Sequence, residues 1–161
     1  MLYLAICWDF EQDHPTPEKL WTNPSLKKLL QDWGRPGDVA VIAVAEEGIP
    51  IGALVLGAVW YRYWTISEHS YRFFDEATPE LGVAVVPQRR GEGIGHRLIL
   101  SILAEAFQLG TKHISLIVAP WHPALRLYKR LGFHKVGISG TSWTIIIDIN
   151  DLLNGQKNHN L

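Results

Sequence analysis

The stretch Pro87-Gln-Arg-Arg-Gly-Glu-Gly-Ile-Gly-His96 places three glycines within five residues, between two regular sequence patterns. Residues 80–86 before it form a short apolar run typical of a strand, and residues 97–109 after it repeat apolar side chains at helical spacing. A strand, a glycine turn and a helix leave backbone N–H groups exposed at the positive end of the helix, and glycines let a ligand approach without meeting Cβ atoms. The sequence therefore predicts a phosphate-binding site in this stretch.

Two common phosphate loops do not fit the spacing. A dinucleotide fingerprint that begins at Gly91 needs glycine at the sixth position, where this chain has His96. It also needs an acidic residue at the end of the next strand, but the chain has none between Glu105 and Asp148. The Gly-Lys-Ser/Thr ending of a P-loop does not occur either. The spacing therefore excludes both a dinucleotide-binding fingerprint and a P-loop.

The rest of the chain alternates strand and helix patterns. Apolar runs predict strands over 2–8, 39–45, 51–60, 113–119, 133–136 and 142–149, with the second and third joined as a β-hairpin. Helical spacing covers 17–33, where Pro24 divides the pattern into two short helices, and 123–131, which Gly132 follows. We expect a loop or irregular helix over 60–74. The pattern predicts one α/β domain over residues 1–153, followed by a polar tail at 154–161.

Composition bounds the protein class. The chain has 161 residues, 47% of them hydrophobic and 19% charged, which is ordinary for a globular domain. Acidic side chains predominate in residues 1–80 and basic ones in residues 81–161, which reflects either chance or a basic cofactor half beside an acidic substrate half. Cys7 stands alone, and the histidines lack metal-ligand spacing, so we expect no disulfide and no metal site. We expect a cytoplasmic protein without membrane or nucleic-acid partners.

Two motifs in order resemble the GNAT superfamily of N-acetyltransferases. Gln88-x-x-Gly91-x-Gly93 is similar to that family's acyl-CoA pyrophosphate loop. Further along, Pro123-Ala-Leu-Arg-Leu-Tyr-Lys-Arg-Leu-Gly-Phe133 resembles the family's second signature, a short helix that ends in Leu-Gly-Phe. The resemblance is strong over residues 79–137 and extends to the hairpin at 39–60. It implies a mixed, mostly antiparallel central sheet flanked by helices, which is splayed at its fourth strand, residues 80–86.

The resemblance also implies that acetyl-CoA is the cosubstrate. Backbone groups of the cofactor strand would pair with the pantetheine arm at Val83, Ala84 and Val85. Backbone N–H groups of the loop would hold the pyrophosphate, and these belong to Arg90, Gly91, Glu92, Gly93, Ile94, Gly95 and His96. The family usually has asparagine where this chain has His122, bonding the pantetheine arm or capping the helix. Histidine is a poorer N-cap, so either the cap is weaker or the imidazole has another role, such as proton transfer.

Tyr128 and Glu80 are the candidate catalytic residues. Helical spacing alone places Tyr128 on an apolar face and indicates a core tyrosine. The resemblance instead implies a general acid that protonates the departing CoA thiolate. Glu80, at the start of the cofactor strand, would act as general base, as a carboxylate does through a water in many members of the family. The alternative for Glu80 is an exposed glutamate at a strand start.

Large aromatic residues cluster where the family's fold places its acceptor cleft. Trp60, Tyr61 and Trp64 predict an aromatic wall around an amine, with Tyr71, Phe73 and Phe74 extending it. A loop clamped by its own rings, or a dimer contact, explains the same pattern. The acidic Glu76 is a further candidate for substrate binding.

Together the residues and the resemblance predict an acyltransferase that moves the acetyl group from acetyl-CoA to a primary amine by direct attack. The acceptor is a small molecule or a peptide, and the protein is a monomer or homodimer. The alternative is a non-catalytic acyl-CoA-binding sensor, or an interaction module that uses the aromatic patch. Fold resemblance gives the reaction class but does not identify the amine.

Overall fold

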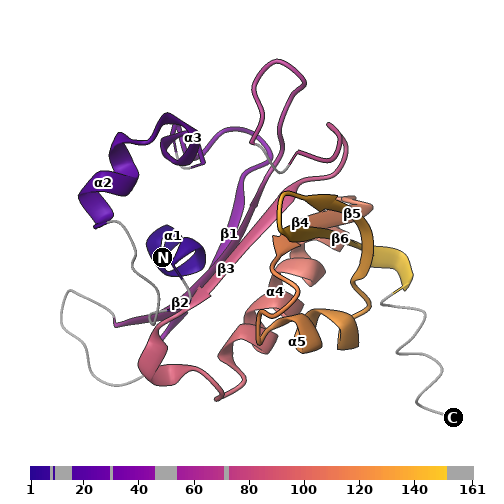
Figure 1. Ribbon diagram of the computed structural model, residues 1–161. Coiled ribbons are helices and arrows are strands. Elements are labelled where there is room, and N and C mark those ends of the chain that lie inside the picture. Colours follow the sequence, from indigo (N-terminus) through magenta and orange to yellow (C-terminus); the bar gives the residue numbers. More distant parts are fainter. Residues whose placement is uncertain (8, 10–15, 30, 46–53, 71–72, 152–161) are drawn as a thin grey trace, which may run out of the picture. The chain divides into compact units, whose positions relative to one another are not determined.

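A computed structural model describes residues 1–7, 9, 16–29, 31–45, 54–70 and 73–151 (Figure 1). The chain divides into two compact units. The first unit comprises Met1–Tyr61 and Gly82–Ile102, and the second comprises Arg62–Leu81 and Leu103–Leu161. The predicted polar tail at 154–161 lies outside the described residues. The described strands form a six-stranded sheet in the order β1-β2-β3-β4-β6-β5.

The first unit contains the predicted hairpin, formed by β1 (Val39–Val44) and β2 (Val55–Arg62). The strands pair antiparallel, with Val39 opposite Tyr61 and Ala40 opposite Trp60. The hairpin is therefore confirmed, although its predicted turn at 46–50 lies outside the described residues. We expected a loop or irregular helix from Trp60, and this was wrong for its first three residues. Aromatic side chains favour strands, and pairing with β1 continues the ladder through Tyr61.

Three short helices begin the first unit: α1 (Leu2–Ile6), α2 (Pro17–Thr22) and α3 (Pro24–Lys27). The strand predicted at 2–8 is wrong, because residues 2–6 are helical. Leucine and alanine favour helices, and so short an apolar run has no decisive period. The division at Pro24 is confirmed, and the Asn23 side chain caps α3 by accepting a hydrogen bond from Ser25 N.

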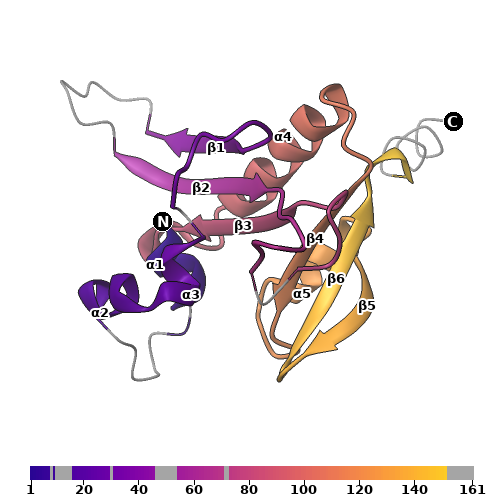
Figure 2. The ribbon, with the colours of Figure 1, turned by 90° about the horizontal axis from the view of Figure 1, so that it is seen from above.

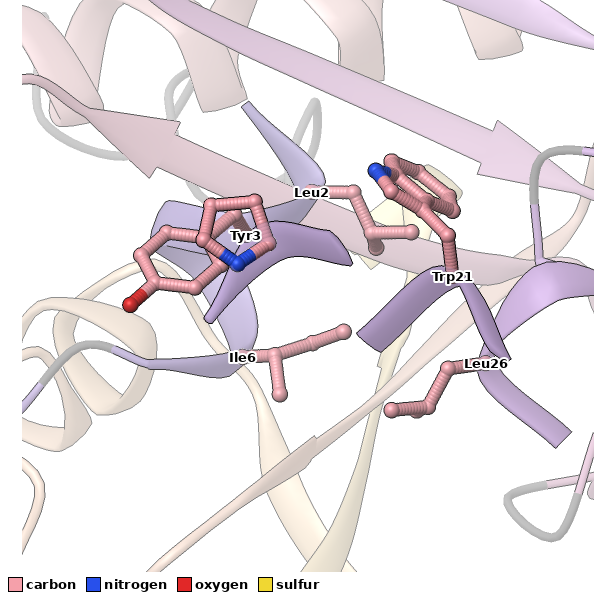
Figure 3. Close-up of a pocket in the computed structure, with 6 residues that line it drawn as sticks. Leu2, Tyr3, Ile6, Trp21 and Leu26 are labelled. Atoms are coloured by element: carbon pink, nitrogen blue, oxygen red, sulfur yellow. The ribbon is translucent and has the colours of Figure 1, made fainter. Parts of the chain in front are cut away.

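An apolar cavity of about 10 Å³ lies among these helices (Figure 3). That volume is close to the minimum for a single water molecule, and an apolar lining offers such a water no hydrogen-bond partners. The cavity is therefore a packing gap rather than a ligand site. Its lining residues are Leu2, Tyr3, Ile6, Pro17, Trp21 and Leu26.

The predicted strand–turn–helix is present as β3 (Glu80–Val85), a single 3-10 turn, η1 (Pro87–Arg89), and α4 (Ile94–Gln108). In the first unit, the first half of α4 lies on one side of β1–β3 and α1–α3 lie on the other (Figure 1). Gly57 of β2 permits this approach, because a Cβ there would lie 3.0 Å from Leu98 Cδ1 and 2.8 Å from Ala84 O. The helical spacing predicted over 97–109 is confirmed by α4, and Gly110, whose φ of 77° is favourable for glycine, follows the end of the helix.

The second unit is built on β4 (His113–Val118), α5 (Leu125–Arg130), β5 (His134–Ser139) and β6 (Ser142–Asp148). Strand β6 pairs antiparallel with both β4 and β5 (Figure 2). Strand β4 also pairs in parallel with β3, at Ser115 and Glu80. Isoleucines on β4 and β6 supply the core, and those with at most 2% of their surface exposed are Ile114, Ile145 and Ile147.

These pairings confirm the predicted fold class, a mixed and mostly antiparallel sheet flanked by helices. The parallel pair lies at the first residue of β3, which agrees with a sheet that opens at this strand. No helix in the described part of the chain combines the length and apolar character needed to cross a membrane.

Candidate active site

The glycine loop has the backbone geometry of an anion site. Gly91 and Gly93 have φ values of 82° and 77°, which side chains with a Cβ rarely adopt. The first recorded helical bond of α4 runs from Arg97 N to Gly93 O, at 3.1 Å. The N–H groups of Ile94, Gly95 and His96 therefore precede the hydrogen-bonded ladder and lie at the positive helix end. This arrangement can accept a phosphate group.

The two loop arginines contact their own loop and strand. Arg89 Nε donates to both carboxylate oxygens of Glu92, at 2.9 and 2.8 Å, in an exposed pair. Arg90 Nε donates to Val85 O, at 3.2 Å, and burial lowers the pKa of Arg90. Arg90 thereby ties the loop to the end of β3. The backbone amides are the part of the loop best placed for an anion.

The cofactor strand supports the loop from one side. Ala84 is buried, whereas Val83 and Val85 are half-buried. Val86 N donates to Leu56 O, which joins the end of β3 to β2. The predicted cofactor residues at 83–85 and 90–96 thus lie in the first unit, whereas His122 lies in the second.

A large open cavity borders this loop within the first unit. Its volume is about 750 Å³, and it lies between β1 and the first half of α4. Sequence reasoning did not find it, because its walls come from segments far apart in the chain. The lining residues are Val41, Ile42, Ala43, Val44, Ala45, Leu56, Arg89, Ile94, Arg97, Leu98 and Ser101.

Glu80 lies in the second unit and is buried, with 9% of its surface exposed. This excludes the alternative of an exposed glutamate at a strand start. The Ser70 hydroxyl donates a hydrogen bond to Glu80 Oε2, and Ser70 is fully buried. Sequence reasoning missed Ser70, because a serine in a loop ten residues upstream carries no local signal.

Tyr128 is buried on α5, also in the second unit. Its ring meets Phe133 edge to face, with the centroids 5.8 Å apart. Burial raises the pKa of Tyr128, so its hydroxyl stays protonated near neutral pH. Among the described residues no hydrogen-bond partner of this hydroxyl is recorded. The side chain thus combines a core ring with a protonated hydroxyl.

His122 has a local role before α5. Its Nδ1 accepts a hydrogen bond from Ala124 N, at 3.0 Å, and its carbonyl accepts one from Leu125 N. The imidazole therefore satisfies the N–H of Ala124, the N-cap residue that precedes the first residue of α5. Trp121 beside it is 61% exposed.

The aromatic segment is more buried than its sequence suggested. Tyr61 and Trp64 are 1% and 4% exposed, and the buried Arg62 lies over the Trp64 ring at 5.7 Å. Trp60 is half-buried, and its ring covers Gly82, where a Cβ would lie 2.6 Å from the indole. These contacts belong to packing within each unit.

Glu76 accepts a hydrogen bond from Ile66 N at 2.9 Å, which shapes the segment between β2 and β3. Phe74 is 44% exposed, and Tyr71 lies outside the described residues. Glu80 accepts a hydrogen bond from Ser70 and pairs with β4. Tyr128 contacts the backbone of α5 and the ring of Phe133. No cluster of metal-ligating side chains occurs within the described ranges.

The chain belongs to the GNAT acetyltransferase family, whose model matches residues 4–133. No curated protein sequence matches the chain. Three solved acetyltransferases share its fold at low sequence identity. PaiA N-acetyltransferase of Thermoplasma acidophilum, solved in complex with coenzyme A, is 13% identical, with 89% of this chain and 86% of that chain covered and a TM-score of 0.63.

The second is the spermidine/spermine N-acetyltransferase SpeG of Vibrio cholerae, which is 20% identical, with 76% of this chain and 73% of that chain covered and a TM-score of 0.57. The third, nourseothricin acetyltransferase, is 21% identical, with 71% of this chain and 66% of that chain covered and a TM-score of 0.52. At these identities the likeness establishes the fold alone.

Proposed function

We propose that this protein transfers the acetyl group of acetyl-CoA to a primary amine by direct attack. The observation that carries the proposal is the loop at 90–96, where two glycines with positive φ lead into the open N-terminus of α4. A helix end of this kind holds phosphate through backbone N–H groups and its dipole. The PaiA structure, a GNAT fold in complex with coenzyme A, supports the same ligand here.

In this proposal the amine nitrogen forms a bond to the acetyl carbonyl carbon while the carbon–sulfur bond breaks. The backbone N–H near Val85 polarises the carbonyl, and the loop holds the pyrophosphate. Most amines are protonated near neutral pH, so an ammonium must first lose a proton, and Glu80 receives it. The nitrogen keeps the electron pair with which it attacks.

Tyr128 supplies the proton that the CoA thiolate takes up. Because burial raises the pKa of Tyr128, the hydroxyl is a weak acid that is present in full near neutral pH. Its proton therefore moves as the carbon–sulfur bond breaks, rather than before. As the amide forms, the nitrogen loses its second proton, which restores the Tyr128 hydroxyl, and Glu80 returns its own proton to the solvent. The products are an amide, free CoA and one proton.

The acceptor is proposed only as a primary amine, on a small molecule or a peptide. SpeG is named for spermidine and spermine, and nourseothricin acetyltransferase is named for nourseothricin, so proteins with this fold differ in acceptor. At about one residue in five identical, neither acceptor transfers to this chain.

A continuous assay of CoA thiol release over a panel of polyamines, amino acids, aminoglycosides and peptides tests this function. We expect acetyl-CoA binding by calorimetry, and CoA release that depends on the added amine. Tyr128→Phe is the matched variant, because it removes one oxygen and keeps the ring against Phe133. Binding of acetyl-CoA without amine-dependent release from any acceptor would contradict catalysis.

A further inference from the structure

Ser70 and Glu80 form a buried hydrogen-bonded pair that the sequence did not reveal. Ser70 has 0% and Glu80 has 9% of its surface exposed. The Ser70 hydroxyl donates to Glu80 Oε2. A hydrogen bond to an ionised carboxylate is stronger than one between neutral groups, and it favours the charged form.

The backbone around Ser70 is fixed by its neighbours. Ser70 O accepts a hydrogen bond from Phe73 N at 3.3 Å and lies 2.7 Å from His69 Nδ1. The His69 and Phe73 rings stack, with their centroids 4.9 Å apart. The contacts with His69 and Phe73 therefore hold the backbone of Ser70, whose hydroxyl donates to the Glu80 carboxylate.

Strand β4 fixes Glu80 from the other side. Ser115 N and Oγ both donate to Pro79 O, at 3.0 and 3.3 Å, and Ser115 is the parallel partner of Glu80. Ser115 is 2% exposed, so it is another buried serine in the same unit. Its hydroxyl, however, bonds a carbonyl rather than the carboxylate.

The charged and titratable neighbours of this pair come from β2 and the 62–79 segment. Val86 N bonds Leu56 O, and Gly82 faces Trp60, so the antiparallel register continues to Arg62 opposite Glu80. Arg62 is 2% exposed. His69, which contacts the Ser70 carbonyl, is a titratable side chain beside Ser70 in the described part of this segment.

We propose that Ser70 is a positioning residue for the general base, holding the Glu80 carboxylate in one orientation and in its ionised form. The inference rests on the proposed function, in which Glu80 accepts the ammonium proton. That proton passes to the carboxylate and the nitrogen keeps its electron pair, while the Ser70 proton stays on its own oxygen.

Ser70→Ala tests this role through the pH dependence of kcat/KM, which reports the pKa of the base in the free enzyme. Removal of a donor raises the pKa of the carboxylate, so the acidic limb should move up by about one pH unit. At a pH below both limbs, kcat/KM of Ser70→Ala should be roughly tenfold lower than that of the wild type, because the deprotonated fraction of the base is roughly tenfold smaller. The dissociation constant of acetyl-CoA should stay unchanged.

Ser115→Ala is the matched control, since it also removes a buried serine hydroxyl from the second unit. It should lose similar stability and leave the acidic limb in place. Ser70→Cys keeps the volume but donates only weakly, so its limb should move in the same direction as that of Ser70→Ala. This second variant decides the question if Ser70→Ala does not fold.

An acidic limb that is the same in wild type, Ser70→Cys and any folded Ser70→Ala would overturn the positioning role. Two reference measurements separate this failure from failure of the proposed function. Wild-type protein without CoA release would refute the acetyltransfer itself, and a wild-type pH profile in Glu80→Gln would remove Glu80 as base. The positioning role alone fails if the wild type releases CoA and Glu80→Gln loses the acidic limb, but the Ser70 variants keep that limb at its wild-type pH.

Discussion

Replacement of Gly93 by alanine separates the backbone cost of the loop from its role in binding. Gly93 has a φ of 77°, and an added Cβ would lie 3.8 Å from Arg97 Nη1, an ordinary contact. The protein itself has room for the methyl group, so the stability cost arises from the left-handed backbone and is about 1–2 kcal/mol. For a chain of this size that lowers Tm by about 2–8 °C.

Gly110 is a close match, because its φ is also 77° and, its own chain neighbours apart, no atom of the described residues lies within 4 Å of its Cβ position. Gly110→Ala should lower Tm by the same amount and leave acetyl-CoA affinity intact. Gly93→Ala should also weaken binding, because the methyl group obstructs approach to the amides at the start of α4. Loss of one hydrogen bond to a charged group corresponds to about tenfold to a hundredfold in Kd.

Calorimetric titration with acetyl-CoA, alongside thermal unfolding of both variants, makes the comparison. If Gly93→Ala binds acetyl-CoA as tightly as Gly110→Ala does, the loop does not hold the pyrophosphate. The reasoning from glycine spacing to cofactor would then be refuted, whatever the protein acetylates.

Three further predictions concern the proposed catalytic role of Tyr128, strand packing and acid stability. Tyr128→Phe should lower kcat about a hundredfold or more with Kd for acetyl-CoA unchanged, and equal turnover in steady-state assays would remove Tyr128 from the mechanism. Gly82→Ala should cost about 1–3 kcal/mol in urea unfolding, because its Cβ would meet the Trp60 ring at 2.6 Å. Gly137→Ala is its control, with 3.8 Å to Thr144 Cβ, and equal stability of the two variants would contradict the clash. For Asp148, desolvation by burial raises the pKa, but the Asn150 N–H at 2.8 Å and the charge of His113 outweigh it and leave the pKa lowered. Its stabilising contribution is therefore present above the unfolded pKa of about 3.9 and is lost as pH falls through the folded value. Between about pH 5 and pH 2, the free energy of unfolding should fall less in Asp148→Asn than in the wild type. If urea unfolding shows the same fall in both proteins, Asp148 does not make this contribution.

Local chemistry made much of the fold predictable. The hairpin, the division at Pro24 and the helix end at Gly110 each follow from signals within a few residues. Residues 2–6 were misassigned to a strand, because Leu2–Ile6 is too short for its period to separate strand from helix. Tyr61 and Arg62 were assigned to a loop or irregular helix, because the strand pairing that extends β2 is not visible along the chain.

The candidate site was predictable in its backbone and less so in its side chains. Glycine spacing predicted the loop, since positive φ is a local property of the residue. The bond between Ser70 and Glu80 joins a loop to a strand start, and only the folded chain brings these residues together. His122 was judged a poor cap by its type, yet its Nδ1 accepts the Ala124 N–H, because an imidazole nitrogen can take the place of an amide oxygen.

The central claim is acetyl transfer from acetyl-CoA to an amine, and isotope tracing tests it most directly. Purified protein is incubated with acetyl-labelled acetyl-CoA and the amine panel, and the products are analysed by mass spectrometry. We expect a labelled amide on at least one acceptor, with CoA released in equal amount and the product formed about a hundredfold more slowly in Tyr128→Phe. Acetyl-CoA that stays intact with every acceptor, while the protein remains folded, would contradict it.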